Sequence, residues 1–403
     1  MRGLTATVQE VLDRRLLSAS PAPIAVALSG GGDSLALALI AADWARAHGR
    51  SLLILTVDHR LRPESAAWTQ ACAATAHRLG ADHRSLAWEG DKPATGLPAA
   101  ARAARHRLIA DAARQAGTNV VLMGHTASDR LEAAAMRQAG ATTPSPREWA
   151  PSPVWPEGRG VFLLRPLLTQ TRSDLRAWLT ERGESWIEDP ANDDLHFARA
   201  RARAGLTGAE TDTVAPARDL ATLALAATDL AGGLLLPREA LREAPQAFLA
   251  TACLCAAGTA RPPRGDHLER LAEALRRDTC LTTTLAGARI EADAREVRFL
   301  RDPGRAGLET RSLAAGQAAV WDGRFEVTTD RPVTIQALAG HAASLPPPQR
   351  AALQRLPAGV RGGLPYLVGE GSPLLAAIPE VSVRALALAR LRAACGVVDR
   401  EPA

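Results

Sequence analysis

The sequence has a single lysine, Lys92, so arginine supplies nearly all of its positive charge. A sequence motif that requires a lysine could therefore occur only around Lys92. Lys92 lies in Gly-Asp-Lys-Pro and not in Gly-Lys-Ser/Thr, which excludes a Walker A phosphate loop. A GC-rich coding sequence explains the bias toward arginine; selection for bidentate phosphate contacts is the alternative.

Paired cysteines and long apolar runs are also missing. The five cysteines are scattered with no Cys-x-x-Cys spacing, which argues against a zinc ribbon or a redox pair. No run reaches the 18 or so apolar residues that a membrane helix needs. Residues 1–15 lack an apolar run and a cleavage site, so we expect a lead-in helix, no membrane segment and a cytoplasmic protein. The net charge of +5 permits a polyanionic partner without requiring one.

The first 200 residues alternate between short apolar runs and helical patterns. The apolar runs are 24–28, 52–57, 83–88, 120–123 and 161–164. The helical patterns are 34–47, 65–79, 98–116, 128–138 and 173–183. This alternation predicts an α/β fold with a parallel sheet covered on both faces. The proline-rich stretch 141–160 is predicted to be a loop, in which Trp149 and Trp155 could stack on RNA bases or simply pack.

The pattern changes after residue 205. Helices are predicted at 217–227, 238–255, 265–277 and 382–394. Two-residue alternation at 282–301 predicts strands, and Asp322-Gly323 between apolar flanks predicts a hairpin turn. We therefore expect three domains: an α/β catalytic domain (1–205), a helical middle region (206–280) and a small α+β domain (281–403).

A glycine-rich loop, Ser29-Gly30-Gly31-Gly32-Asp33-Ser34, follows the first apolar run and opens a helix. Glycines allow successive N–H groups to converge, and a helix N-terminus adds partial positive charge, so the loop predicts a phosphate site and an ATP-using enzyme. Asp33 would repel bare phosphate, which points to Mg²⁺ beside it. The spacing does not fit the dinucleotide fingerprint. The alternative is a tight turn without a ligand.

Polar residues follow two further apolar runs, with Asp58 and His59 after one and Gly124 and His125 after the other. The carboxyl ends of parallel strands meet at one sheet edge, where such folds bind ligands. We therefore expect these four residues beside the loop. Either histidine could instead belong to the core or to a loop.

The loop resembles the pyrophosphatase-loop (PP-loop) signature of enzymes that cleave ATP to AMP and pyrophosphate. Further segments resemble the tRNA(Ile)-lysidine synthetase family: VDHRLR at 57–62, ARAARH at 101–106, GHTASDRLE at 124–132, DPAN at 189–192 and FARARAR at 197–203. Their shared order over residues 24–203 makes the resemblance specific.

The resemblance implies ATP-dependent adenylation of the wobble cytidine (position 34) in the CAU-anticodon isoleucine tRNA. Free L-lysine would then displace AMP to give lysidine. It implies catalytic roles for Asp33, Asp129, Glu132 and Arg199. It also implies nucleotide binding by Ser29 to Ser34, Asp58, His59, Gly124 and His125, with Asp33 toward Mg²⁺, and tRNA-binding C-terminal domains.

Asp129 and Glu132 are three residues apart on a helix and therefore share a face, where they could hold a lysine ammonium. The alternative is a solvated acidic face. Arg165 and Arg199 to Arg203 could meet phosphates, or they could be ordinary surface arginines.

The sequence departs from the family at Ser128 and Ala133, where the pattern has a carboxylate and a threonine. An inactive tRNA-binding relative is therefore one alternative. Another PP-loop enzyme, acting on a small molecule or a different tRNA base, is the second. A thiolase would need catalytic cysteines, and the first half has only Cys72.

Overall fold

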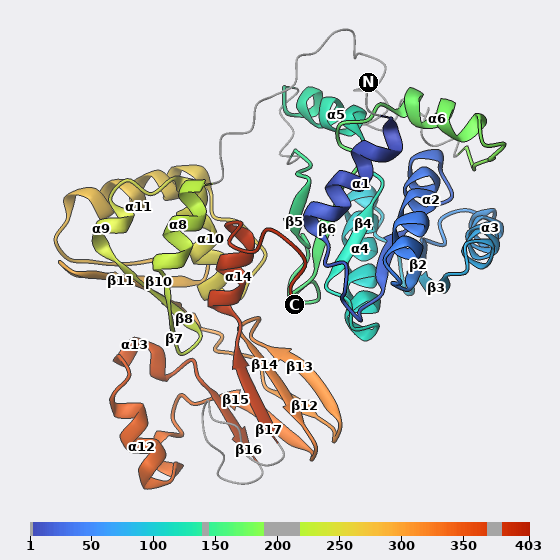
Figure 1. The fold of residues 1–403 in the computed structure, drawn as a ribbon. Coiled ribbons are helices and arrows are strands. Elements are labelled where there is room, and N and C mark those ends of the chain that lie inside the picture. Colours follow the sequence, from blue (N-terminus) through green and yellow to red (C-terminus); the bar gives the residue numbers. More distant parts are fainter. Residues whose placement is uncertain (1–2, 139–144, 189–217, 369–380) are drawn as a thin grey trace. The chain divides into compact units, whose positions relative to one another are not determined.

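The computed structural model describes residues 3–138, 145–188, 218–368 and 381–403, and the chain forms two compact units (Figure 1). Unit 1 comprises Met1–Ala215 together with Val398–Ala403, and unit 2 comprises Pro216–Val397. In the described ranges, no helix has both the length and the apolar character that crossing a membrane requires.

Unit 1 is built on a six-stranded sheet with the order β3-β2-β1-β4-β6-β5. The strands are β1 (Ile24–Ala27), β2 (Leu52–Asp58), β3 (Asp82–Ala87), β4 (Val120–Met123), β5 (Trp149–Pro151) and β6 (Phe162–Leu164). Neighbouring strands are parallel, except that β5 pairs antiparallel with β6. The predicted parallel sheet is confirmed. The stretch 141–160 is not entirely a loop, because β5 lies within it at the sheet edge, where proline is tolerated.

Helices cover both faces of this sheet (Figure 1). They are α1 (Leu4–Arg15), α2 (Gly32–Ala47), α3 (Ser65–Arg78), α4 (Leu97–Gln115), α5 (Ala127–Gln138) and α6 (Arg172–Thr180). Ile24 and Val26 of β1 face a core shared with α1, α2 and α6. Ala25 faces a second core with Ile109 of α4. Burial on both faces explains why the strands are continuous apolar runs.

The strand order creates a crevice at the carboxyl edge of the sheet. From β1 the chain builds outward through β2 to β3, and then returns to place β4 on the other side of β1. Where the strand order reverses in this way, the loops that follow the two adjacent strands run in opposite directions and leave a crevice between them. Ligands of open α/β sheets bind in this crevice. The loops after β1 and β4 are the segments that the sequence singled out.

The last residues of the sequence return to unit 1 after unit 2. Arg50 Nη1 and Glu401 Oε2 are 2.8 Å apart, and each side chain is only 2% exposed. The Leu17 N–H also donates to Glu401, at 2.7 Å. Trp149 Nε1 donates to the Val398 carbonyl at 2.8 Å. Unit 1 is therefore discontinuous in sequence.

Unit 2 contains an antiparallel five-stranded sheet with the order β7-β8-β11-β10-β9. Its strands are β7 (Thr228–Leu230), β8 (Gly233–Pro237), β9 (Leu281–Leu285), β10 (Ala288–Ala292) and β11 (Glu296–Arg301). The helices that pack near it are α8 (Arg218–Ala226), α9 (Arg238–Leu241), α10 (Gln246–Ala257), α11 (Gly265–Arg277) and α14 (Ala387–Ala394). The region 206–280 is therefore not purely helical, and the sheet takes strands from both sides of residue 280. The predicted helix 238–255 is interrupted before Pro245, which directly precedes α10.

Two three-stranded sheets, β12-β15-β16 and β13-β14-β17, complete unit 2. Their elements are β12 (Arg311–Leu313), β13 (Gln317–Trp321), β14 (Phe325–Thr329), β15 (Val333–Ala337), η2 (Ala342–Ser344), α12 (Pro347–Gln354), α13 (Ala358–Arg361), β16 (Pro365–Val368) and β17 (Val381–Ala385). The predicted hairpin turn is confirmed, with positive φ at Asp322 and Gly323. The predicted helix 382–394 is wrong in its first part, because the alternating Val-Ser-Val-Arg-Ala segment pairs with β14 as a strand.

Candidate active site

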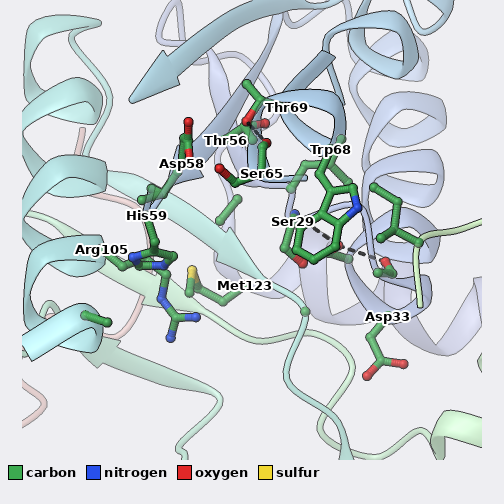
Figure 2. A pocket seen from close by; sticks show the side chains of 18 of the residues that line it. Ser29, Asp33, Thr56, Asp58, His59, Ser65, Trp68, Thr69, Arg105 and Met123 are labelled. Atoms are coloured by element: carbon green, nitrogen blue, oxygen red, sulfur yellow. Dashed lines mark hydrogen bonds between the residues drawn. The ribbon is translucent and has the colours of Figure 1, made fainter. Parts of the chain in front are cut away.

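A cavity of about 910 Å³ lies at the carboxyl edge of the unit 1 sheet (Figure 2). The loops after β1, β2 and β4 form its floor, and α3, α4 and the N-terminus of α6 contribute to its walls. Most of the predicted site residues line it: Ser29, Gly31, Gly32, Asp33, Ser34, Asp58, His59, Gly124, His125 and Asp129. Strand ends that are distant in sequence therefore meet around one space, as the sequence indicated.

The loop after β1 is held in shape by a serine hydroxyl. Ser34 Oγ donates to the Gly31 carbonyl at 2.9 Å and accepts from the Ser29 N–H at 3.2 Å. Helix α2 begins at Gly32, so the N–H groups of its first turn have no partner within the helix. These donors point to the cavity end of the helix, where the helix dipole favours an anion.

Gly30 is favoured by its backbone conformation, and Gly124 by a close approach of two backbones. Gly30 has φ +86°, and a Cβ there would lie 2.4 Å from Ile187 Cδ1. At Gly124, a Cβ would lie 3.0 Å from the Ser34 backbone nitrogen. The loop after β4 is thus in contact with the first turn of α2, which only glycine permits without moving backbone.

The segment after α6 packs over the phosphate loop. The Ile187 N–H donates to the Gly30 carbonyl at 2.9 Å. The Trp186 ring would be 3.4 Å from a Cβ at Gly32, and its Nε1 donates to Glu188 at 2.8 Å. Nothing in the local sequence identified this segment as part of the site.

Asp58 and His59 lie at the opposite side of the cavity, near Arg105 (Figure 2). Asp58 Oδ1 accepts from the Arg60 N–H at 2.8 Å, which fixes the carboxylate at the strand end. Burial, reinforced by the Arg105 charge, lowers the pKa of His59, so its ring is neutral at pH 7. His59 Nδ1 is buried and has no hydrogen-bond partner within the described part of the chain.

His125 is oriented by Arg165. Arg165 is 6% exposed, and its Nε donates to His125 Nδ1 at 3.2 Å. An Nδ1 that accepts leaves Nε2 as the donor of a neutral ring. Burial, followed by repulsion from Arg102, Arg147 and Arg105, lowers the pKa of Arg165 to about 10. Arg165 is still charged at pH 7 and is not an ordinary surface arginine.

Three carboxylates converge on one guanidinium, that of Arg172. Its Nε lies 3.0 Å from Asp33 Oδ2, its Nη1 3.5 Å from Glu132 Oε1 and its Nη2 3.9 Å from Asp129 Oδ2. Asp129 is 7% exposed, and Glu132 is completely buried. The two helical carboxylates therefore do not form a solvated acidic face.

The pKa of Asp33 is set by two opposing effects. Its burial raises its pKa above the usual aspartate value, and the hydrogen bond and charge of Arg172 partly oppose that rise. A cation placed beside Asp33 would therefore be favourable. Across the described ranges, no group of three or more His, Cys, Asp or Glu is arranged to hold a metal ion.

Some predicted residues stay untested or lie elsewhere. Arg199 and the rest of Arg199 to Arg203 lie outside the described residues. Trp149 stacks on Phe162 with ring centroids 5.0 Å apart, so it packs against the sheet edge. Sequence analysis missed Arg172 and Trp68 as cavity residues, and it quoted Arg105 within the segment 101–106 without giving it a role. For Arg172 the only sequence signal was its place next to a predicted helix start.

Comparison with known proteins agrees with this geometry. A family model described as a PP-loop domain matches residues 4–210. The tRNA(Ile)-lysidine synthase of Caulobacter vibrioides is 50% identical over 408 aligned residues, which cover 98% of each chain. The chain belongs to the tRNA(Ile)-lysidine synthase family. The Hyphomonas neptunium member is 36% identical over 79% of this chain and 90% of its own.

Membership in the tRNA(Ile)-lysidine synthase family makes the chain an ATP-using ligase of the PP-loop class. The Rhodopseudomonas palustris member is also 36% identical and is covered over 95% of its length. Among solved structures, a U34-tRNA thiolase from Methanococcus maripaludis aligns over 50% of this chain and 71% of its own, with 13% identity and a TM-score of 0.41.

Proposed function

We propose that the chain joins free L-lysine to C2 of cytidine 34 in the CAU-anticodon isoleucine tRNA, through an adenylated cytidine. The O2 atom of the cytidine attacks the α-phosphorus of ATP, and pyrophosphate leaves. The lysine ε-amine then attacks C2, and the C2–O bond breaks to release AMP. The observation that carries this proposal is one cavity whose walls hold both a phosphate loop and Asp129, with the fully buried Glu132 on the same helix.

The phosphate end of the cavity supports the first step. Donor N–H groups in the first turn of α2 suit the pyrophosphate of ATP, and His125 Nε2 and Arg105 add donors along the wall. Asp58 and His59 would then meet the base and sugar. Gly124 lets the β4 loop approach closely enough to confine the phosphates.

Mg²⁺ fits beside Asp33, because it binds through one or two carboxylates together with substrate phosphates. Asp33 follows the first residue of α2 and is 18% exposed at its side chain. The ion would neutralise the charge of the pyrophosphate leaving group. Asp33 must be ionised to hold it.

Asp129 and Glu132 support the second step. Two carboxylates on one helix face, largely shielded from water, favour an ammonium over a neutral group. The Thr126 N–H and hydroxyl donate to Asp129 Oδ2 at 2.8 and 3.1 Å, which fixes the direction of that carboxylate. Before attack the ammonium must lose a proton, and a carboxylate in contact with it can accept that proton.

We expect Arg199 to Arg203 and unit 2 to contribute to tRNA binding. Several strand arginines of unit 2 are already paired: Arg289 with Glu291 at 2.7 Å, and Arg301 with Asp322 at 3.0 Å. Support for tRNA binding by unit 2 therefore comes from family membership more than from unpaired charge.

The test uses radiolabelled lysine, ATP and unmodified isoleucine tRNA. We expect label in the tRNA with one pyrophosphate released per lysine incorporated. Asp33→Asn should abolish pyrophosphate release. Asp129→Asn and Glu132→Gln should retain tRNA-dependent pyrophosphate release and require much more lysine. Label that never enters RNA would overturn the proposal.

The alternatives give different results in the same assay. Another PP-loop adenylating enzyme would release pyrophosphate with a different acceptor, and release without any tRNA would indicate a small molecule. An inactive relative, suggested by Ser128 and Ala133, would bind tRNA and release none. Ala133 is buried, at 4% exposed, and both carboxylates of the proposed amine site, Asp129 and Glu132, are present in this sequence.

A further inference from the structure

The chain supplies its own cation to the carboxylate pair. Arg172 is the first residue of α6, and Thr171 caps that helix by accepting from the Asp174 N–H. The Gln170 carbonyl accepts from the Ala127 N–H at 2.9 Å, which ties the start of α6 to the start of α5. The backbone thereby directs the guanidinium to the face of α5 that carries Asp129 and Glu132.

The three contacts of the guanidinium differ in strength. The 3.0 Å contact to Asp33 is a charge-assisted hydrogen bond, whereas 3.5 Å to Glu132 and 3.9 Å to Asp129 exceed the usual length of one. The guanidinium is therefore anchored at Asp33 and only loosely attached to the α5 pair. Moving the guanidinium away from the α5 pair breaks only its two long contacts.

An ammonium bound to Asp129 and Glu132 would lie beside this guanidinium. Two like charges a few ångströms apart repel strongly in a site shielded from water. Arg172 and a substrate ammonium therefore compete for the same carboxylates. We propose that Arg172 is a resident cation of the amine site, which offsets part of the negative charge of Asp129 and Glu132 until lysine displaces it, while its contact with Asp33 persists. This inference rests on the proposed function.

Arginine suits this role for a chemical reason. A guanidinium remains protonated at all physiological pH values and is not a nucleophile, whereas a desolvated lysine amine is one. A resident lysine could attack the adenylated cytidine in place of the substrate. Arg172 can stabilise the empty site without entering the reaction.

Equilibrium dialysis of radiolabelled L-lysine against the full chain tests the inference. Arg172→Gln removes the competitor and leaves the pair, so lysine should bind about tenfold more tightly than to the unmodified protein. Arg172→Lys retains a cation and should bind lysine no more tightly. The matched control is Arg182→Gln, which removes a guanidinium that stacks on Trp178 at 3.8 Å, outside the cavity, and should leave binding unchanged.

Weaker or unchanged lysine binding by Arg172→Gln would overturn the inference, as would tighter binding by both Arg172 variants. Circular dichroism shows whether each variant is folded. Should Arg172→Gln fail to fold, the Arg172→Met variant offers the same comparison. Failure of the proposed function is separate, since it appears as absence of label transfer to tRNA by the unmodified protein, however well that protein binds lysine.

Discussion

At the scale of single residues, the site depends on how Asp33 and Arg172 adjust one another. Burial raises the pKa of Asp33, and Arg172 opposes the rise. In the proposed Mg²⁺ role Asp33 must be ionised, so we expect Arg172 to extend adenylation to lower pH. The same guanidinium lies near the amine site, which links the two halves of the reaction through one side chain.

The pH dependence of adenylation checks this link. Removing the Arg172 guanidinium removes the hydrogen bond and the charge that lower the pKa of Asp33, so the Asp33 carboxyl group protonates at a higher pH. In Arg172→Gln the acid limb of tRNA-dependent ATP–pyrophosphate exchange should therefore move to higher pH, while Arg182→Gln keeps the original profile. An acid limb that stays in place, or moves to lower pH, would contradict the assignment.

At the scale of elements, the site is a set of strand ends and helix starts held in contact. The β4 loop and the first turn of α2 meet at Gly124 and Ser34, and the segment after α6 closes over Gly30. These contacts are between backbones, which cannot yield as a flexible side chain would. Small changes there should alter catalysis more than stability.

Substitution of Gly124 tests this expectation. In Gly124→Ala the new Cβ would lie 3.0 Å from the Ser34 nitrogen and must push the loop from α2. We expect kcat/KM for ATP to fall roughly threefold or more, since backbone must shift by a few tenths of an ångström in an active site that is sensitive to position. Gly3→Ala is the control, because a Cβ there meets nothing within 4 Å. Equal activity of the two variants would count against a required close approach.

Elements with strong local signals were predictable from the sequence. Strands β1, β2 and β4 are buried on both faces, and the residues that follow them carry recognisable polar motifs. The short strands β5 and β7 have three residues each and little pattern, and β17 was merged with α14 because no glycine or proline separates them. Arg172 and Ile187 enter the site through tertiary packing, which leaves no mark in the local sequence.

At the scale of the whole molecule, unit 1 is closed by residues that follow unit 2. The pair of Arg50 and Glu401 is almost completely buried, and Arg50 also donates to the carbonyls of Leu17 and Ala22 at 2.7 Å. A buried pair contributes little when intact, but removing one partner leaves an uncompensated charge.

Glu401→Gln should lower the free energy of unfolding of unit 1 by about 3–5 kcal/mol, measured by urea denaturation. Asp43→Asn is the matched control, because its pair with Arg46 is exposed at 63% and 67% and should cost under about 1 kcal/mol. Similar losses in the two variants would show that the last residues do not hold the unit together.

The return of the chain also sets an order of events on the ribosome. Strands β1 to β6 emerge early, yet the carboxylate that neutralises Arg50 is translated only after all of unit 2. A nascent chain that stops within unit 2 lacks the Glu401 carboxylate that pairs with Arg50 in the full sequence. We expect the catalytic half of such a truncated chain to be less stable than in the full sequence, because the Arg50 charge loses this partner.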